Sequence, residues 1–176
     1  MVTIDTNSGF DDPASRGDQL LAALDHVVDD SPAADLVDPE RLAVMGWSMA
    51  AVRSRRRPTI PPSGPPSRSP WNTTTDWSSV TVPTLLVGCQ DDVVAPVAFH
   101  SEPFYESLTA DLDKAYLEDR RGGDHYCVTE SDDTIAVSVV SFLKRFVDGD
   151  ERYDQFLCPP PADTDISEYR DTCPYG

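Results

Sequence analysis

Ser48 is the residue of this sequence whose setting most clearly indicates chemistry. It follows a short apolar run from Leu42 to Gly46, in the pattern Gly-Trp-Ser. A strand that ends in Gly-x-Ser carries its serine onto a sharp turn, where the hydroxyl can act as a nucleophile. The glycine that usually closes this motif is replaced by Ala50. The run therefore predicts a nucleophilic serine on a turn with an unusual closing residue.

An aspartate and a histidine follow Ser48, in the order that one type of nucleophilic triad uses. Asp92 and His125 each come just after a further apolar run. A serine hydroxyl is a weak nucleophile until a base removes its proton. We expect His125 to be that base, and Asp92 to orient and stabilise the imidazolium. Asp91 is an alternative to Asp92, because spacing alone does not separate the two.

The neighbours of these residues predict other parts of an acyl-transfer site. The backbone N–H of Met49, directly after the serine, would stabilise an oxyanion, and the sequence offers no candidate for a second donor. Trp71 stands in a polar loop, where an aromatic ring is better placed to stack on a substrate than to join the core. Trp47 beside the serine fits either a cleft or the core, and Tyr126 beside His125 adds a third ring.

Helices and strands are expected to alternate along the chain. The apolar pattern predicts helices over 12–29, 97–108 and 133–147, and strands over 42–46, 84–88 and 114–118. Such alternation indicates a mainly parallel sheet flanked by helices, and hence an α/β fold. Three strands are few for a parallel sheet, because such a sheet needs helices over both faces and protection of both edge strands. We therefore expect the C-terminal part of a domain whose N-terminal strands are missing.

The segment 50–69 has a composition unlike that of the rest of the chain. It is rich in arginine and proline, and no acidic residue occurs between Glu40 and Asp76. Its prolines exclude a helix beyond about Arg57. One interpretation is a basic, proline-rich loop. The interpretation that we favour is a paired frameshift in the gene, because one nucleotide restored after the Met49 codon converts the segment to a glycine- and alanine-rich helix. DNA sequencing tests this hypothesis.

Length and charge limit the classes of protein to consider. The 176 residues suit one domain, taken here as 1–176. The net charge is −17, with 31 acidic and 14 basic residues, which disfavours nucleic acid or an anionic membrane as a partner. No apolar run is long enough to cross a bilayer. This composition fits an exported protein, although Met1 leads directly into polar residues and no signal peptide is visible.

The cysteines indicate the redox setting. An even number predicts two disulfides in an oxidising compartment, and the absence of any C-x-x-C spacing disfavours a zinc or thioredoxin-like site. The four are Cys89, Cys127, Cys158 and Cys173. A Cys158–Cys173 bridge would close the tail, 150–176, which has little apolar content. The alternative is a cytosolic protein with free thiols.

Several strings of residues resemble bacterial cutinases and PET (polyester) hydrolases, which belong to the α/β-hydrolase superfamily. The strings are Gly46-Trp47-Ser48-Met49, Pro70-Trp71-Asn72, Ser78–Leu86, Asp92–Pro96, Glu102–Tyr105, Leu143–Asp148 and Arg152–Phe156. They span nearly the whole chain except 50–69. The resemblance implies a secreted serine ester hydrolase with the α/β-hydrolase fold. Such an enzyme cleaves polyesters, cutin-like polymers or short-chain acyl esters without a cofactor or a metal, and we expect a monomer.

The resemblance also implies a role for individual residues. Ser48 matches the nucleophile, Asp92 rather than Asp91 the triad acid, His125 the base and Met49 the oxyanion donor. Three further positions match the substrate cleft, namely Trp47, Trp71 and Val94. Tyr126, which adjoins His125, would add another ring to this cleft. A Cys89–Cys127 disulfide would tie the two triad loops together, and Cys158–Cys173 matches a C-terminal bridge.

The departures from that family support a second hypothesis. The early strands would supply the second oxyanion donor, and Ala50 adds a Cβ atom where strand and helix pack closely. The alternative function is therefore a truncated, frameshifted and non-catalytic remnant of such a hydrolase. Covalent labelling of Ser48 separates the two hypotheses.

Overall fold

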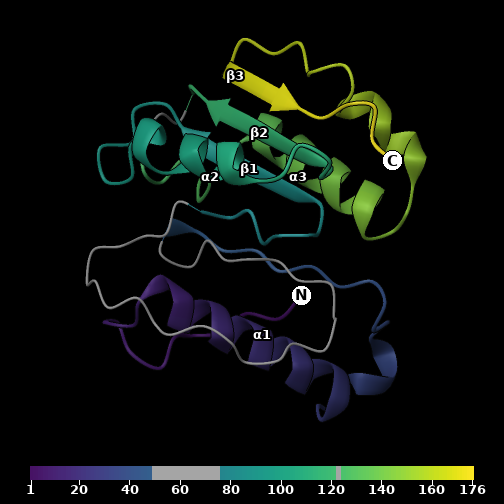
Figure 1. Ribbon diagram of the computed structural model, residues 1–176. Coiled ribbons are helices and arrows are strands. Elements are labelled where there is room, and N and C mark those ends of the chain that lie inside the picture. The colour runs from purple at the N-terminus through teal and green to yellow at the C-terminus, as the bar shows by residue number, and fades with distance from the viewer. Residues whose placement is uncertain (49–75, 122–123) are drawn as a thin grey trace. The chain divides into compact units, whose positions relative to one another are not determined.

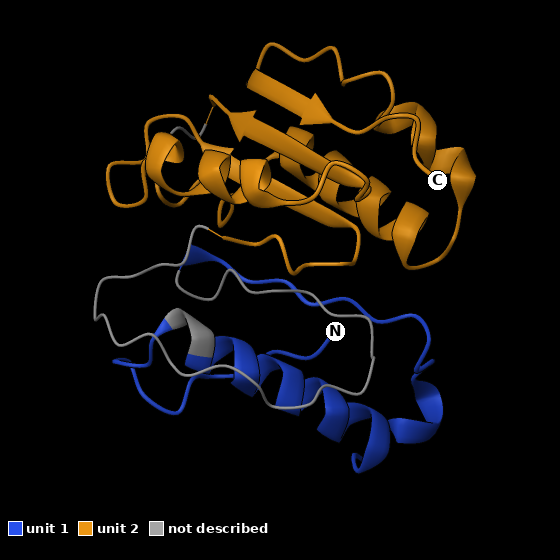
Figure 2. Cartoon of the chain, in the orientation of Figure 1, with its two compact units in different colours: residues 1–73 blue, residues 74–176 orange. Residues whose placement is uncertain are grey.

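The computed structural model describes residues 1–48, 76–121 and 124–176 (Figure 1). The chain divides into two compact units, residues 1–73 and residues 74–176 (Figure 2). Three predictions fall outside the described residues: the oxyanion donor Met49, the aromatic residue Trp71, and the interpretation of 50–69. No helix in the described part of the chain is both long enough and apolar enough to cross a membrane.

The first unit contains the predicted N-terminal helix. Helix α1 spans Pro13–Asp29, and Asp12 caps it by accepting a hydrogen bond from the N–H of Ser15 at 2.9 Å. The loop before the helix is tied back to it, since the N–H of Asn7 donates to Oε1 of Gln19 at 2.8 Å. A short 3₁₀ helix, η1, follows at Ala34–Leu36. The prediction of a helix over 12–29 is therefore confirmed.

The predicted strand at 42–46 is wrong. Residues 42–47 have no regular secondary structure, and Met45 is 62 % exposed. An apolar run becomes a strand only where a neighbouring strand accepts and donates its backbone hydrogen bonds. The described residues of the first unit contain no strand that could do so. The run is apolar enough for a strand, but the described residues of this unit offer it no pairing partner.

The second unit is built on a mixed three-stranded sheet in the order β1-β2-β3. The strands span Thr84–Cys89, Lys114–Asp119 and Ile166–Asp171. Strands β1 and β2 are parallel, as expected, whereas β3 runs antiparallel to β2 and was not predicted. Every residue of β2 is buried, so this strand forms the centre of the sheet. Together with its helices the sheet makes an α/β fold.

Helices α2 (Ser101–Ser107) and α3 (Asp133–Phe146) cover opposite faces of the sheet (Figure 1). Side chains alternate between the faces along β2. Tyr116 packs beside Tyr105 of α2, with ring centroids 5.8 Å apart. Leu117 belongs instead to the buried cluster that includes the first turn of α3. The predicted closing helix is confirmed, and the predicted helix 97–108 is divided into a 3₁₀ turn, η3 (Val97–Phe99), and α2.

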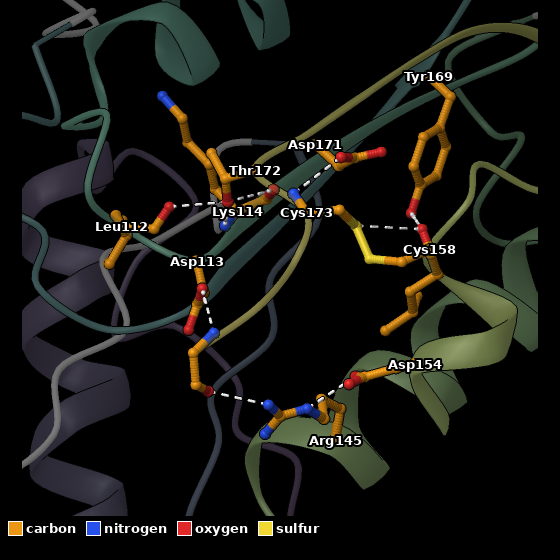
Figure 3. The surroundings of a disulfide bond; sticks show 12 residues. Leu112, Asp113, Lys114, Arg145, Asp154, Cys158, Tyr169, Asp171, Thr172 and Cys173 are labelled. Atoms are coloured by element: carbon orange, nitrogen blue, oxygen red, sulfur yellow. Dashed lines mark hydrogen bonds and ion pairs between the residues drawn. A yellow bond between two sulfur atoms is a disulfide. The ribbon is translucent and has the colours of Figure 1, made fainter. Parts of the chain in front are cut away.

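The C-terminal tail is fixed by a disulfide and by a buried arginine (Figure 3). Cys158 and Cys173 are bonded, as the sequence predicts. Arg145 of α3 donates from Nε to Asp154 at 2.7 Å and from Nη2 to the carbonyl of Gly176 at 2.9 Å. These contacts hold β3 and the residues around it against the sheet, although the tail has few apolar side chains.

Replacing Gly88 by alanine is expected to destabilise the second unit by about 1–3 kcal/mol, because the site has no room for a methyl group. A Cβ atom there would lie 2.8 Å from Oγ of Ser101, 2.9 Å from Cγ1 of Val97 and 3.0 Å from the hydroxyl of Tyr116. Urea unfolding measures the change. Gly9→Ala is the control, since no atom lies within 4 Å of its added carbon. Equal unfolding midpoints for the two variants would contradict the expected crowding.

Candidate active site

The backbone at Ser48 has the conformation that a nucleophilic turn requires. Its φ is 55°, and it is the one non-glycine residue with positive φ among the residues that the structure describes. Residues other than glycine adopt this left-handed backbone conformation at a cost of about 1–3 kcal/mol, and residues in strained conformations cluster at functional sites. Ser48 is also exposed, and the neighbouring Trp47 is 41 % exposed. The positive φ of Ser48 is compatible with the turn predicted at Gly-Trp-Ser, and residues 42–47, which lead into it, form no strand.

In the second unit, His125 and Asp92 form a close pair. Nδ1 of His125 donates a hydrogen bond to Oδ2 of Asp92 at 2.7 Å. The two side chains are only 11 % and 8 % exposed. A hydrogen bond at Nδ1 fixes the tautomer in which Nε2 is the basic nitrogen. The pair therefore has the geometry of a general base with its orienting carboxylate.

The other oxygen of Asp92 is held by the backbone. Oδ1 accepts hydrogen bonds from the N–H of Val94 at 2.8 Å and from the N–H of Ala95 at 2.7 Å. Burial acts to raise the pKa of Asp92, but the hydrogen bonds donated by Ala95, His125 and Val94 together lower it below its usual value. The carboxylate thus stays ionised, as an orienting group for an imidazolium must.

This lowered pKa predicts an acid-sensitive contribution to stability. A carboxyl group with a lower pKa in the folded protein stabilises the fold above its unfolded pKa of about 3.9, and the contribution is lost as the pH falls through the lower, folded value. We expect Asp92→Ala to be less stable than the wild type at neutral pH, with the difference shrinking below about pH 4. Urea unfolding at several pH values measures it. A difference that grows on acidification would contradict the expected direction.

His125 lies in a turn that is closed by several local hydrogen bonds. The N–H of Cys127 donates to the carbonyl of Asp124 at 3.2 Å, and the N–H of Tyr126 donates to Oδ1 of Asp124 at 2.8 Å. The ring of Tyr126 stands edge-on to the imidazole, with centroids 5.6 Å apart. Tyr126 is 55 % exposed, so its ring is both beside the base and open to solvent.

A disulfide connects the two loops that carry the pair. Cys89 ends β1 and is bonded to Cys127, two residues after His125. Cys89 lies opposite Asp119, the last residue of β2, in the parallel register. Asp92 and His125 therefore both follow the carboxyl ends of adjacent parallel strands, where α/β proteins place their functional groups. The bridge covalently joins these two loops.

The structure brings together some of the predicted site residues. Asp92, His125, Val94 and Tyr126 gather in the second unit, and Val94 is 65 % exposed. Asp92 rather than its rival Asp91 contacts the histidine.

Ser48 and Trp47 belong to the first unit, residues 1–73. Sequence reasoning missed the turn-forming role of Asp124, although an aspartate that precedes a turn is a known signal. Among the described residues, no group of three His, Cys, Asp or Glu side chains is arranged to hold a metal ion.

Comparison with known proteins gives a consistent result. The model of a family described as PET hydrolase-like matches residues 1–174. A bis(hydroxyethyl) terephthalate hydrolase of Streptomyces coelicolor is 46 % identical over 181 residues, which cover 100 % of this chain and 57 % of that protein. Cutinase 1 of Thermobifida cellulosilytica is 45 % identical over 184 residues, covering 99 % of this chain and 69 % of the relative.

A cutinase of Thermobifida fusca is also 45 % identical, with 99 % of this chain and 60 % of the relative covered. The chain thus spans between 57 % and 69 % of the length of these relatives. All three names describe hydrolases of carboxylic esters. A family model that matches nearly the whole chain, together with this level of identity, establishes that the chain belongs to the PET hydrolase-like family.

Proposed function

We propose that this protein is a serine ester hydrolase with an α/β-hydrolase fold, which cleaves polyesters, cutin-like polymers or short-chain acyl esters. The observation that carries the proposal is the partly buried hydrogen bond of 2.7 Å between His125 and Asp92. Membership of the PET hydrolase-like family supports it. The positive φ of Ser48 supports the assignment of the nucleophile.

The proposed reaction proceeds through an acyl-enzyme. Oγ of Ser48 attacks the ester carbonyl while Nε2 of His125 removes the hydroxyl proton, and Asp92 stabilises the resulting imidazolium. The N–H of Met49 donates to the oxyanion of the tetrahedral intermediate. His125 then returns its proton to the departing alcohol. In the second half, His125 activates a water molecule that hydrolyses the acyl-enzyme and regenerates the serine.

The exposed apolar side chains near His125 suit the acyl part of the substrate. Tyr126 and Val94 stand on either loop of the pair and are both more than half exposed. Apolar and aromatic surfaces of this kind bind ester substrates that carry rings or alkyl chains. In the proposed enzyme Trp47 and Trp71 contribute further rings to the same cleft. We also propose a secreted protein, which agrees with the two disulfides.

Covalent labelling with an alkyl fluorophosphonate tests the function. This probe forms a stable bond to an activated serine, and mass spectrometry identifies the modified residue. We expect labelling at Ser48, none in Ser48→Ala, and unchanged labelling in the control Ser79→Ala, which alters an exposed serine. Full labelling of Ser48→Ala would overturn the choice of nucleophile. A folded wild-type protein with no labelling would favour the non-catalytic remnant.

A further inference from the structure

Asp124 accepts two of the hydrogen bonds that close the turn around His125. Its carbonyl accepts from the N–H of Cys127 at 3.2 Å, and its Oδ1 accepts from the N–H of Tyr126 at 2.8 Å. His125 is the residue between Asp124 and Tyr126. The hydrogen bond from the Asp124 side chain therefore closes a ring that contains both peptide units flanking His125. This ring restricts the backbone angles of His125 and hence the direction of its side chain.

The far side of the turn is fixed independently. The carbonyl of Tyr126 accepts two hydrogen bonds from Thr129, one from its N–H and one from its hydroxyl, both at 2.8 Å. Cys127 is only 2 % exposed and is bonded to Cys89 at the end of β1. Residues after the histidine are thus held by a covalent bond and a local network. On the near side, the side-chain bond of Asp124 is a contact that serves the same purpose.

Asp92 is held by the same type of contact. Its Oδ1 accepts from the backbone N–H groups two and three residues further along the chain, at 2.8 and 2.7 Å. Its Oδ2 remains directed at His125, at 2.7 Å. Both partners of the pair therefore depend on an aspartate side chain that accepts a hydrogen bond from its own loop. A hydrogen bond of 2.7 Å tolerates little rotation of either group before it lengthens and weakens.

We propose that Asp124 is a positioning residue for His125, acting through its acceptor oxygen on the N–H of Tyr126 and not through its charge. The proposal rests on the function proposed above, because positioning the base matters for catalysis only if His125 is the base. It makes a separate structural claim as well. Without the Asp124 acceptor, the turn widens and the His125–Asp92 hydrogen bond is populated for less of the time.

Three variants of the full chain test the proposal. Asp124→Ala removes the acceptor, whereas Asp124→Asn removes the charge and keeps an oxygen that can accept from Tyr126. Asp76→Ala is the matched control, because Oδ1 of Asp76 accepts from the N–H of Ser78 at 2.9 Å in a turn that carries no proposed site residue. Two quantities are measured for each protein. The first is the NMR signal of the Nδ1 proton of His125, and the second is the rate of Ser48 labelling at several probe concentrations.

We expect Asp124→Ala to broaden or lose the Nδ1 proton signal and to slow the maximal labelling rate about five- to ten-fold, the effect of losing one ordinary hydrogen bond. The probe concentration at half-maximal rate should stay unchanged. Asp124→Asn and Asp76→Ala should keep both the signal and the rate. Circular dichroism at the measurement temperature establishes that each variant is folded. If Asp124→Ala does not fold, a loss of the signal and the rate in Asp124→Asn still contradicts the proposal, because this variant keeps the acceptor and lacks only the charge.

Two results would overturn the proposal. One is an unchanged signal and rate in Asp124→Ala, which would show that the disulfide and Thr129 hold the turn alone. The other is an equal loss in Asp124→Asn and Asp124→Ala, which would assign the effect to the charge. Failure of the proposed function is a distinct outcome. In that case no protein labels at Ser48, while the Nδ1 proton signal still reports whether Asp124 positions the histidine.

Discussion

For the proposed triad, replacing Asp92 by asparagine is expected to lower the rate of Ser48 acylation by about 10⁴-fold, the loss that the corresponding change causes in a serine protease. The local hydrogen bonds determine how the new amide must lie. The oxygen that accepts from the N–H groups of Val94 and Ala95 has to remain in place, because an NH₂ group cannot accept those bonds. The amide nitrogen then faces His125.

This orientation reverses the tautomer of the histidine. An amide NH₂ at the position of Oδ2 donates to Nδ1, so the ring proton must move to Nε2. A protonated Nε2 in a neutral imidazole cannot remove the serine proton. The loss is therefore expected in the acylation rate and not in the binding of the probe.

Asp91→Asn is the control for this prediction. Asp91 is adjacent in sequence and exposed, and it was the alternative triad acid on spacing alone. Fluorophosphonate labelling rates measured for both variants, with unfolding midpoints to establish that both are folded, make the comparison. If Asp91→Asn lost the activity and Asp92→Asn kept it, the assignment of the acid would be wrong.

The part of the fold that the sequence predicts well is the part with local signals. Helix α3 has an aspartate N-cap whose side chain accepts from the N–H of Ile135, and Lys144 and Arg145 lie in its last turn, where positive charge is favourable. Strand β1 is a short apolar run introduced by Pro83, and β2 has an apolar centre, Ala115–Leu117, that follows turn residues. Each of these features is readable within a window of a few residues.

Strand β3 could not be predicted in this way, because its stabilising contacts are distant in sequence. Half of its residues are charged, and all are only partly buried. Arg170 bonds Glu102 of α2 at 2.6 Å, and Ser167 donates to Glu118 of β2 at 2.7 Å. These partners lie 68 and 49 residues away. The polarity of β3 is thus matched by polar partners that only the folded chain brings near.

At 42–46 the sequence predicts a strand that the structure does not have, and the cause is related. Apolar composition predicts burial, but a strand also needs a neighbour for its backbone, and composition does not encode the neighbour. In the candidate site, too, some features can be read from the sequence and others depend on the folded chain. The order of Ser48, Asp92 and His125 was readable from the sequence, and so was the cysteine count. The contacts that orient the pair come from backbone N–H groups and from Asp124, and these depend on turn geometry.

Removing the Cys89–Cys127 disulfide is expected to destabilise the second unit by about 4 kcal/mol, and removing Cys158–Cys173 by about 3 kcal/mol. These values follow from loops of 38 and 15 residues, since a longer closed loop restricts the unfolded chain more strongly. The double variants Cys89→Ser/Cys127→Ser and Cys158→Ser/Cys173→Ser provide the comparison. Urea unfolding of each, under non-reducing conditions, measures the loss.

The two disulfides contribute similarly to stability, but they join different parts of the second unit. Cys89–Cys127 joins the loops of Asp92 and His125, whereas Cys158–Cys173 joins the tail to the end of β3. At a temperature where both variants stay folded, only the first should weaken the Nδ1 proton signal of His125 and slow the labelling of Ser48. Equal slowing in both would mean that the pair responds to the stability of the whole unit. A selective effect would show that the bridge acts on the His125–Asp92 geometry itself, because the bridge joins the loops that carry the two residues.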